Sequence, residues 1–328
     1  MVFQQKRRLY FKIKRPIVLI LIIIAVAFVY QYIADYESYR SIAIGRLIMN
    51  SYPANATEEV PKTLPQQQGV NVYSNDKAQI DATNLSEGYL LIKYTGGKSV
   101  PIKLQITKKD GITYTYNLDN SGKSEIFSLT EGDGEYQVNV MENIGGTKYT
   151  LAFGQSVRFS ARSSLLPFMY PNQFVDYSNA PQTIAQAKAL TSTQGSDLDK
   201  LSAIYQYIVK NFTYDYDFAK VVASGYVPKI ESVLASKKGI CFDYASLTCA
   251  MLRSQGIPSK LVIGYAGDAY HAWINVYIET IGWIEQVIYF DGRKFYLMDP
   301  TFASGARLSP DIYKYIGDGA NYRSKYVY

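Results

Sequence analysis

The run Gly239-Ile240-Cys241-Phe242-Asp243-Tyr244-Ala245 decides how the second half of this 328-residue chain folds. Gly239 interrupts the preceding helical pattern, and from Cys241 apolar residues recur at helical spacing as far as Leu252. Gly256 then ends the pattern. The sequence therefore predicts a helix of about fifteen residues with Cys241 in its first turn.

The position of Cys241 at a helix start has a chemical consequence. Unpaired backbone N–H groups and the positive end of the helix dipole favour a thiolate there over a thiol. Asp243 opposes this effect, and we interpret it as an acid that stabilises the helix start rather than as a catalytic group. A buried cysteine at a helix start is the alternative interpretation of Cys241 taken alone.

A second cysteine, Cys249, follows on the same predicted helix. The two Cα atoms would lie about 12 Å apart, which exceeds the roughly 7 Å that a disulfide tolerates. Both thiols are therefore predicted to be free. Because Cys249 shares the apolar face with Leu252, we expect it to be a small buried residue, which leaves a reactive role to Cys241.

His271 is the only histidine of the chain and begins a predicted strand, residues 271–278. Asp299 ends a later predicted strand, residues 294–299. A thiol, an imidazole and a carboxylate in this order are the parts of a cysteine nucleophile system, in which the base activates the sulfur and the acid orients the base. Since neighbouring strands could bring His271 and Asp299 within hydrogen-bond distance, these residues and Cys241 are the candidate catalytic groups.

Further predicted elements surround these residues. Ser196-Asp197-Leu198-Asp199 has the spacing of a capping box, and apolar residues then recur at helical spacing to Phe212. A shorter helix is expected over residues 230–238. Predicted strands occupy residues 260–265, 271–278, 282–287 and 294–299.

Four motifs in this order resemble the transglutaminase-like superfamily, which has a papain-like cysteine fold, and the similarity covers about residues 196–305. The resemblance implies an α+β papain-like core with Cys241 as nucleophile, His271 as base and Asp299 as orienting acid. The stretch from Trp283 to Asp299 is longer than the family pattern, which affects the path of the sheet but not the triad. The motifs are Gly239-Ile240-Cys241-Phe242-Asp243-Tyr244-Ala245, Leu252-Arg253-Ser254-Gln255-Gly256-Ile257-Pro258, His271-Ala272-Trp273 and Asp299-Pro300-Thr301.

The resemblance does not determine the reaction. Some members of the superfamily pass an acyl group from a glutamine amide to an amine, others resemble proteases or amide hydrolases, and some have lost activity. The implied first half-reaction is common to the active ones: the thiolate attacks a carbonyl, the Cys241 N–H helps to hold the oxyanion, and His271 protonates the leaving amine. Three hypotheses stay open, namely a transglutaminase-like acyltransferase, a cysteine peptidase or amidase with the same triad, and an inactive surface binding module.

Three aromatic residues are further candidates for the site. Tyr214 could supply an oxyanion donor, and Trp273 and Trp283 could wall an acyl-binding cleft, although packing is the alternative role of all three. The chain has no second histidine, and its carboxylates do not cluster with the thiols, so we predict no metal site. No glycine-rich phosphate-binding loop is present, and we predict no cofactor.

Residues 70–161 have a different pattern, in which short alternating runs are separated by turn signals such as Asp110-Gly111 and Gly145-Gly146. About seven strands fit into about 90 residues, which indicates a small antiparallel β-sandwich. This segment contains no histidine or cysteine. We interpret it as a packing and presentation domain, with binding of a wall polymer through its tyrosines as the alternative. Residues 162–328 are assigned to the catalytic domain.

The N-terminal segment predicts a membrane anchor. Residues 1–15 form a basic tail, and residues 16–33 are almost continuously apolar, approaching the ~20 residues that cross a bilayer. The positive tail before this span predicts a single-pass protein with its body outside the cytoplasm. Because Ala25-Val26-Ala27 resembles a cleavage site, secretion after cleavage near Ala27 is the alternative. Residues 34–69 are expected to form a juxtamembrane helix and a linker.

The charge distribution argues against nucleic acid as a partner. The net charge is +6, and six of the 34 basic residues lie in the basic tail, which leaves 28 basic and 28 acidic residues in the body. A neutral body implies no basic groove. The expected partners are instead the membrane and a surface-protein or cell-wall-peptide substrate. The oligomeric state stays open.

Overall fold

The computed structural model describes residues 69–266, 268–284, 288–290, 295–297 and 322–328. All of them belong to one compact unit of the chain. The predicted basic tail, the signal-anchor and the linker up to residue 68 lie outside the described residues, as does Asp299. Within the described part of the chain, no helix is long and apolar enough to cross a membrane.

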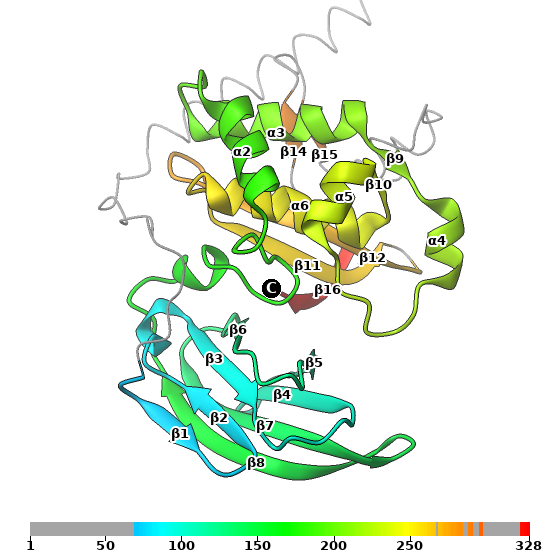
Figure 1. The fold of residues 1–328 in the computed structure, drawn as a ribbon. Coiled ribbons are helices and arrows are strands. Elements are labelled where there is room, and N and C mark those ends of the chain that lie inside the picture. Colours follow the sequence, from blue (N-terminus) through cyan, green and yellow to red (C-terminus); the bar gives the residue numbers. More distant parts are fainter. Residues whose placement is uncertain (1–68, 267, 285–287, 291–294, 298–321) are drawn as a thin grey trace, which may run out of the picture. The chain divides into compact units, whose positions relative to one another are not determined.

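Two antiparallel sheets of four strands each occupy residues 72–159 (Figure 1). Their strand orders are β1-β2-β3-β6 and β5-β4-β7-β8, and inward-facing side chains of both sheets share one hydrophobic core. The strands are β1 (Val72–Ser74), β2 (Ala78–Asp81), β3 (Tyr89–Tyr94), β4 (Ile102–Lys108), β5 (Thr113–Leu118), β6 (Glu125–Ser128), β7 (Gly134–Gly145) and β8 (Lys148–Phe159).

The alternating sequence pattern explains how these strands pack. In β5 exposed residues alternate with Tyr114, Tyr116 and Leu118, which are buried, as period-two geometry requires when one face meets a core. β4 alternates in the same way and buries Leu104. The antiparallel strands predicted from this alternation are present, with eight strands where about seven were expected.

Glu142 on β7 is a buried carboxylate of these sheets, with 1% of its surface exposed. It accepts hydrogen bonds from Lys98 Nζ at 2.9 Å, Tyr94 Oη at 2.7 Å and Lys77 Nζ at 3.1 Å. These contacts, with Lys98 the largest contributor, lower the pKa of Glu142 from 4.5 to about 2. The carboxylate is thus more acidic in the folded than in the unfolded state. Its contribution to stability is fully present above pH 4.5 and is lost as the pH falls towards 2.

We expect Glu142→Gln to lower the free energy of unfolding by about 1–3 kcal/mol at pH 7. The difference from the wild type should shrink as the pH falls from 4.5 towards 2, because the wild-type carboxylate is then protonated as well. Urea unfolding of the full chain, followed by near-ultraviolet circular dichroism of its tyrosines, measures both. Glu135→Gln is the matched control, since Glu135 is an exposed partner of Lys109. A destabilisation that does not vary with pH would contradict this assignment.

The second half of the described chain combines helices with a third antiparallel sheet of four strands, in the order β13-β12-β11-β16. The helices are α2 (Pro181–Thr191), α3 (Asp197–Asn211), α4 (Tyr216–Val221), α5 (Ile230–Ser236) and α6 (Cys241–Ser254). The sheet strands are β11 (Ser259–Ala266), β12 (Ala269–Ile278), β13 (Gly282–Ile284) and β16 (Tyr322–Val327). Two short pairs complete the described strands, β9 (Thr213–Tyr214) with β10 (Lys238–Gly239) and β14 (Ile288–Phe290) with β15 (Phe295–Leu297). The described residues also contain two 3-10 helices, η1 (Leu85–Glu87) and η2 (Leu166–Phe168).

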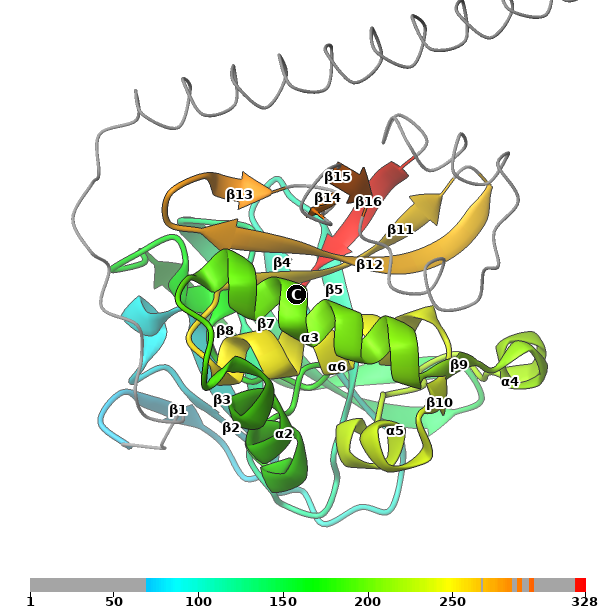
Figure 2. The same ribbon diagram turned by 90° about the horizontal axis from the view of Figure 1, so that it is seen from above.

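Helix α6 is the centre of this half. It contacts α2, α3 and α5 as well as strands β11 and β12, and Figure 2 shows the helices gathered beside the sheet. Its residues from Asp243 to Arg253 are all buried, as expected for a helix that is covered on every side. The helix begins at Cys241, as predicted. The predicted cap of α3 is also confirmed, because Ser196 Oγ accepts a hydrogen bond from Asp199 N at 3.1 Å.

Strand β12 has two different faces. Ala272, Ile274 and Val276 belong to the main core together with α6, whereas Trp273 packs on the other face in a smaller cluster with Tyr322. Opposite His271 in the register stands Gly264, where a Cβ atom would lie 2.0 Å from the carbonyl oxygen of Arg323. Close packing of β16 against β11 therefore requires glycine at this position.

An aromatic seam joins the sandwich strands to the second half; we use this term for Tyr114, Tyr116, Phe174 and Tyr328. Phe174 lies 5.7 Å from Tyr116 and 4.7 Å from Tyr328 between ring centroids, and Tyr328 lies 5.4 Å from Tyr114. All four residues belong to the main core cluster or pack against it. The sandwich strands and the helical half thus share a continuous hydrophobic core in the described residues.

Candidate active site

Cys241 is the first residue of α6 and is a free, partly exposed thiol. Ile240 before it has extended backbone angles, and its carbonyl accepts the first helical hydrogen bond, from Tyr244 N at 3.1 Å. The N–H groups of the first turn have no helical partners, and the helix dipole adds positive potential at this end. Both effects favour negative charge on the Cys241 sulfur or on a substrate oxygen beside it.

Asp243 stabilises the start of α6, as the sequence suggested. Its carboxylate accepts hydrogen bonds from Ile240 N at 2.8 Å and from Tyr226 Oη at 2.7 Å. The side chain is 2% exposed, and burial raises the pKa of Asp243 above its ordinary value. A Cβ atom on Gly239 would lie 2.7 Å from that of Asp243, so this arrangement also requires the glycine. The carboxylate thereby holds the backbone in front of Cys241 in position.

His271 lies near the start of β12 and is 8% exposed. Its ring lies 6.5 Å from the Trp273 ring and 6.4 Å from the Tyr322 ring, between centroids. His271 pairs with Gly264 of β11, so its backbone belongs to the ladder of these two strands. These contacts position the imidazole within the folded sheet.

Cys241 and His271 line the same cavity, with a volume of about 700 Å³, which we call the cysteine cavity. Its wall comes from the start of α6, the start of β12, the segment from Ala219 to Val227, and strands β4 and β5 of the sandwich. Much of this wall is aromatic. The aromatic lining residues are Tyr116, Phe174, Tyr214, Tyr226, Phe242, Tyr270, Tyr326 and Tyr328.

Tyr214 is brought to the cysteine cavity by local strand pairing. It lies opposite Gly239 in the parallel β9–β10 pair, two residues before Cys241. Its ring stacks on Tyr244 at 6.3 Å with an interplanar angle of 13°. Tyr214 therefore packs against α6 and lines the cavity at the same time, and its part in holding an oxyanion stays a prediction.

The two tryptophans do not line the cysteine cavity. Trp273 is 2% exposed and packs edge-on against Tyr322 at 5.1 Å. Trp283 lines a separate cavity of about 450 Å³, where its ring lies 5.3 Å from that of Phe168 and carries Lys260 Nζ at 3.9 Å from its centroid. Strand packing thus accounts for Trp273, and a packed cation–aromatic contact accounts for Trp283.

The comparison with known families covers this part of the chain. Residues 184–286 match the model of the transglutaminase-like superfamily. The matched residues begin within α2, end two residues after β13 and include both Cys241 and His271. The match supports a transglutaminase-like core within a mixed α/β chain that contains antiparallel sheets, and we call residues 184–286 the transglutaminase-like segment.

Two curated proteins resemble this chain. Uncharacterized protein YebA of Bacillus subtilis is 22% identical over 193 residues, which cover 50% of this chain and 25% of YebA. UPF0252 protein MJ1282 of Methanocaldococcus jannaschii is 32% identical over 115 residues, which cover 30% of this chain and 32% of that protein. The chain thus spans between a quarter and a third of the length of these relatives.

Two solved structures have more distant similarity. A candidate cysteine protease from Cytophaga hutchinsonii is 16% identical with a TM-score of 0.34, over 79% of this chain and 81% of the other. Red sea bream transglutaminase is 12% identical with a TM-score of 0.26, over 63% of this chain and 49% of the other. Scores this low establish neither a shared fold nor a shared activity.

The two thiols of the transglutaminase-like segment differ in how far they are buried. Cys249 is fully buried, and burial raises its pKa to about 11, whereas Cys241 is partly exposed at the cysteine cavity.

Among the residues that the structure describes, no group of three or more histidines, cysteines or carboxylates could hold a metal ion.

The sequence did not indicate Tyr226 as part of the site. It lies in the irregular stretch between α4 and α5, where no periodic pattern exists, and yet its hydroxyl donates to the Asp243 carboxylate at the cavity wall. Tyr270 was also not singled out. It is 59% exposed beside His271, and burial of the rest of the ring, with neighbouring tyrosines and the Cys241 thiol, raises its pKa. A tyrosine next to the only histidine was the one available signal.

Proposed function

We propose that this chain is a membrane-anchored, extracytoplasmic cysteine enzyme that acts on amide bonds of surface protein or wall peptide through a thioacyl intermediate. The observation that carries the proposal is that a free thiol at a helix start and the only histidine of the chain line one cavity. Such a pair is the minimum equipment for thiolate attack on a carbonyl. The family match over residues 184–286 supports the same chemistry.

The proposed reaction has two halves. The Cys241 thiolate forms a C–S bond to the amide carbon, and the oxyanion is stabilised by the Cys241 N–H at the positive end of α6. The C–N bond then breaks as His271 transfers its proton to the leaving amine, which leaves a thioester. In the second half an amine or water attacks the thioester carbon and gives a proton to His271. The C–S bond then breaks, which releases the acyl product and restores the Cys241 thiolate. Asp299 is proposed as the acid that orients His271.

Acyl transfer is the leading form of the proposal, because exclusion of water favours an amine acceptor over hydrolysis. The aromatic wall of the cysteine cavity supports such exclusion. A cysteine peptidase or amidase with the same triad is the second candidate. Incorporation of a fluorescent primary amine into a glutamine-containing protein would select transfer, whereas release of a new amine without incorporation would select hydrolysis.

The proposal also includes the location of the protein at the membrane, with its body outside the cytoplasm. A basic tail followed by an apolar span supports a single-pass anchor with the body outside the cytoplasm, and secretion after cleavage near Ala27 is the alternative. Protease added to intact cells should degrade the body of the anchored protein. Protection from that protease would exclude an extracytoplasmic location.

Iodoacetamide labelling of the full chain across a range of pH tests whether Cys241 is activated. We expect rapid labelling of Cys241 below pH 7 that slows in His271→Ala, because the imidazole stabilises the thiolate. Cys249 is the internal control, since it is fully buried and should react only after denaturation. Labelling of Cys241 no faster than that of a free thiol with a pKa of about 8.5 would contradict the proposal and favour an inactive binding module.

A further inference from the structure

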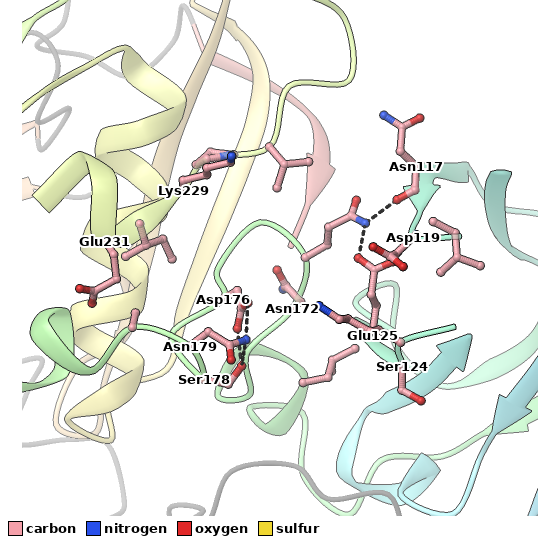
Figure 3. A pocket seen from close by; sticks show the side chains of 18 residues that line it. Asn117, Asp119, Ser124, Glu125, Asn172, Asp176, Ser178, Asn179, Lys229 and Glu231 are labelled. Carbon is pink, nitrogen blue, oxygen red and sulfur yellow. Dashed lines mark hydrogen bonds between the residues drawn. The ribbon is translucent and has the colours of Figure 1, made fainter. Parts of the chain in front are cut away.

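A second cavity, which we call the acidic cavity, lies next to the cysteine cavity and has a volume of about 630 Å³ (Figure 3). Its wall comes from the end of β5, the start of β6, the loop before α2 and the start of α5. Asn117, Gln173 and Val227 line both cavities. The two cavities therefore share part of their walls, and one extended ligand could reach from one to the other.

Asn172 lines this cavity and carries a buried, unpaired donor. The residue is 5% exposed, and its Oδ1 accepts hydrogen bonds from Phe174 N at 3.1 Å and Val175 N at 3.0 Å, which fixes the orientation of the amide. Its Nδ2 is buried without a hydrogen-bond partner. A buried donor without an acceptor costs free energy, so this position favours a ligand that supplies an acceptor oxygen.

Gln173 presents the complementary group. Its Nε2 donates to the carbonyl of Asn117 at 2.6 Å and to Glu125 Oε1 at 3.0 Å. Its Oε1 is buried and has no partner. An unpaired donor and an unpaired acceptor on adjacent residues match the carbonyl and the N–H of a peptide.

The charged groups of the cavity favour a cation. Four carboxylates line it, against the ammonium groups of Lys123 and Lys229. In the described part of the chain neither lysine forms an ion pair with them, although the charge of Lys123 contributes to lowering the pKa of Asp119. Burial raises the pKa of Glu125, and the nearby charges of Asp119 and Asp176 raise it further. A bound cation would relieve this repulsion. The four carboxylates belong to Asp119, Glu125, Asp176 and Glu231, which Figure 3 labels.

The cation required here is larger than a metal ion. No group of three or more carboxylates in the described residues is close enough to hold one metal. Separated carboxylates beside a peptide-like donor and acceptor fit a flexible side chain that carries an ammonium group on a backbone. Lysine-type residues have this combination of groups.

We propose that the acidic cavity binds a lysine-type residue of a peptide, with its carbonyl accepting from Asn172 Nδ2 and its ammonium group donating to Glu125 and Asp119. This inference rests on the proposed function where it makes the bound peptide a substrate. A peptide that continues past Gln173 into the cysteine cavity would carry its cationic residue a short distance from the reacting amide. The sandwich then takes part in substrate selection, because Asp119 and Glu125 belong to it.

Binding of a small probe to the full chain carrying Cys241→Ala tests the site without any turnover. Nα-acetyl-lysine amide is titrated and observed by nuclear magnetic resonance, with Nα-acetyl-norleucine amide as the uncharged probe of similar length. We expect the lysine probe to bind at least about tenfold more tightly, and Glu125→Gln and Asp119→Asn each to remove about tenfold of its affinity. Glu135→Gln, which removes one exposed carboxylate elsewhere on the sandwich, should leave the affinity unchanged.

Three results would distinguish failure of the lysine site from failure of the proposed enzyme. Equal affinity for both probes, or equal weakening by Glu125→Gln and Glu135→Gln in variants with wild-type circular dichroism, would overturn the lysine site. Selective binding together with an unreactive Cys241 in the labelling experiment would support the site as a binding pocket and overturn the proposed enzyme. A reactive Cys241 without selective binding would support the enzyme and overturn the site.

Discussion

Replacing Cys241 by alanine is expected to lower turnover by at least about 1,000-fold, because covalent catalysis cannot begin without the thiol. The residue begins α6, where unpaired N–H groups and the helix dipole favour the thiolate, and it shares a cavity with His271. His271→Ala should have a similarly large effect, since the imidazole stabilises the thiolate and protonates the leaving amine. The double variant should be no slower than either single one, because the two residues act as a unit.

Cys249→Ser is the matched control for this prediction. It changes the other thiol of the same helix, which is fully buried, so it should alter stability rather than the chemical step. Both tryptophans of the chain lie in this half, on β12 and β13, and their fluorescence reports whether each variant is folded. Retention of wild-type turnover in folded Cys241→Ala would exclude the cysteine mechanism.

Replacing Arg253 by methionine is expected to lower the free energy of unfolding by about 3–5 kcal/mol. Arg253 is 2% exposed near the end of α6, and burial lowers its pKa. Its guanidinium donates to the carbonyl of Ser259 at 3.1 and 2.7 Å, to that of Tyr170 at 2.7 Å and to that of Tyr328 at 2.9 Å. Methionine fills most of the volume but leaves three buried carbonyls without these donors.

The Arg253 contacts also explain why the loss of stability should extend beyond α6. They connect α6 to the start of β11, to the loop before α2 and to Tyr328 of the aromatic seam. Urea unfolding followed by tryptophan fluorescence measures the loss. The control is Arg158→Met, because Arg158 is an exposed residue of β8, and a change within about 0.5 kcal/mol is expected there. A loss below about 1 kcal/mol for Arg253→Met would contradict this account.

Local sequence signals predicted the elements around Cys241 well. Gly239, the helical spacing from Cys241 and the cap at Ser196 depend on neighbours a few residues away, and the structure has the two helices as predicted. Strand alternation likewise predicted the antiparallel sheets before residue 160. The position of Tyr226 could not be predicted in this way, because the irregular stretch that contains it has no period, and its hydrogen bond to Asp243 joins residues 17 apart in the chain.

The sequence by itself determined which groups this protein can use for chemistry and which element carries each, since it contains one histidine and places one cysteine at a helix start. Only the tertiary structure decided what surrounds them. It put Tyr116 and Asn117 of the sandwich at the cavity that Cys241 lines, paired β16 with β11 and placed Trp283 at another cavity. These contacts join residues far apart in the chain, and they depend on how complete faces of sheets and helices pack, which no local periodicity specifies.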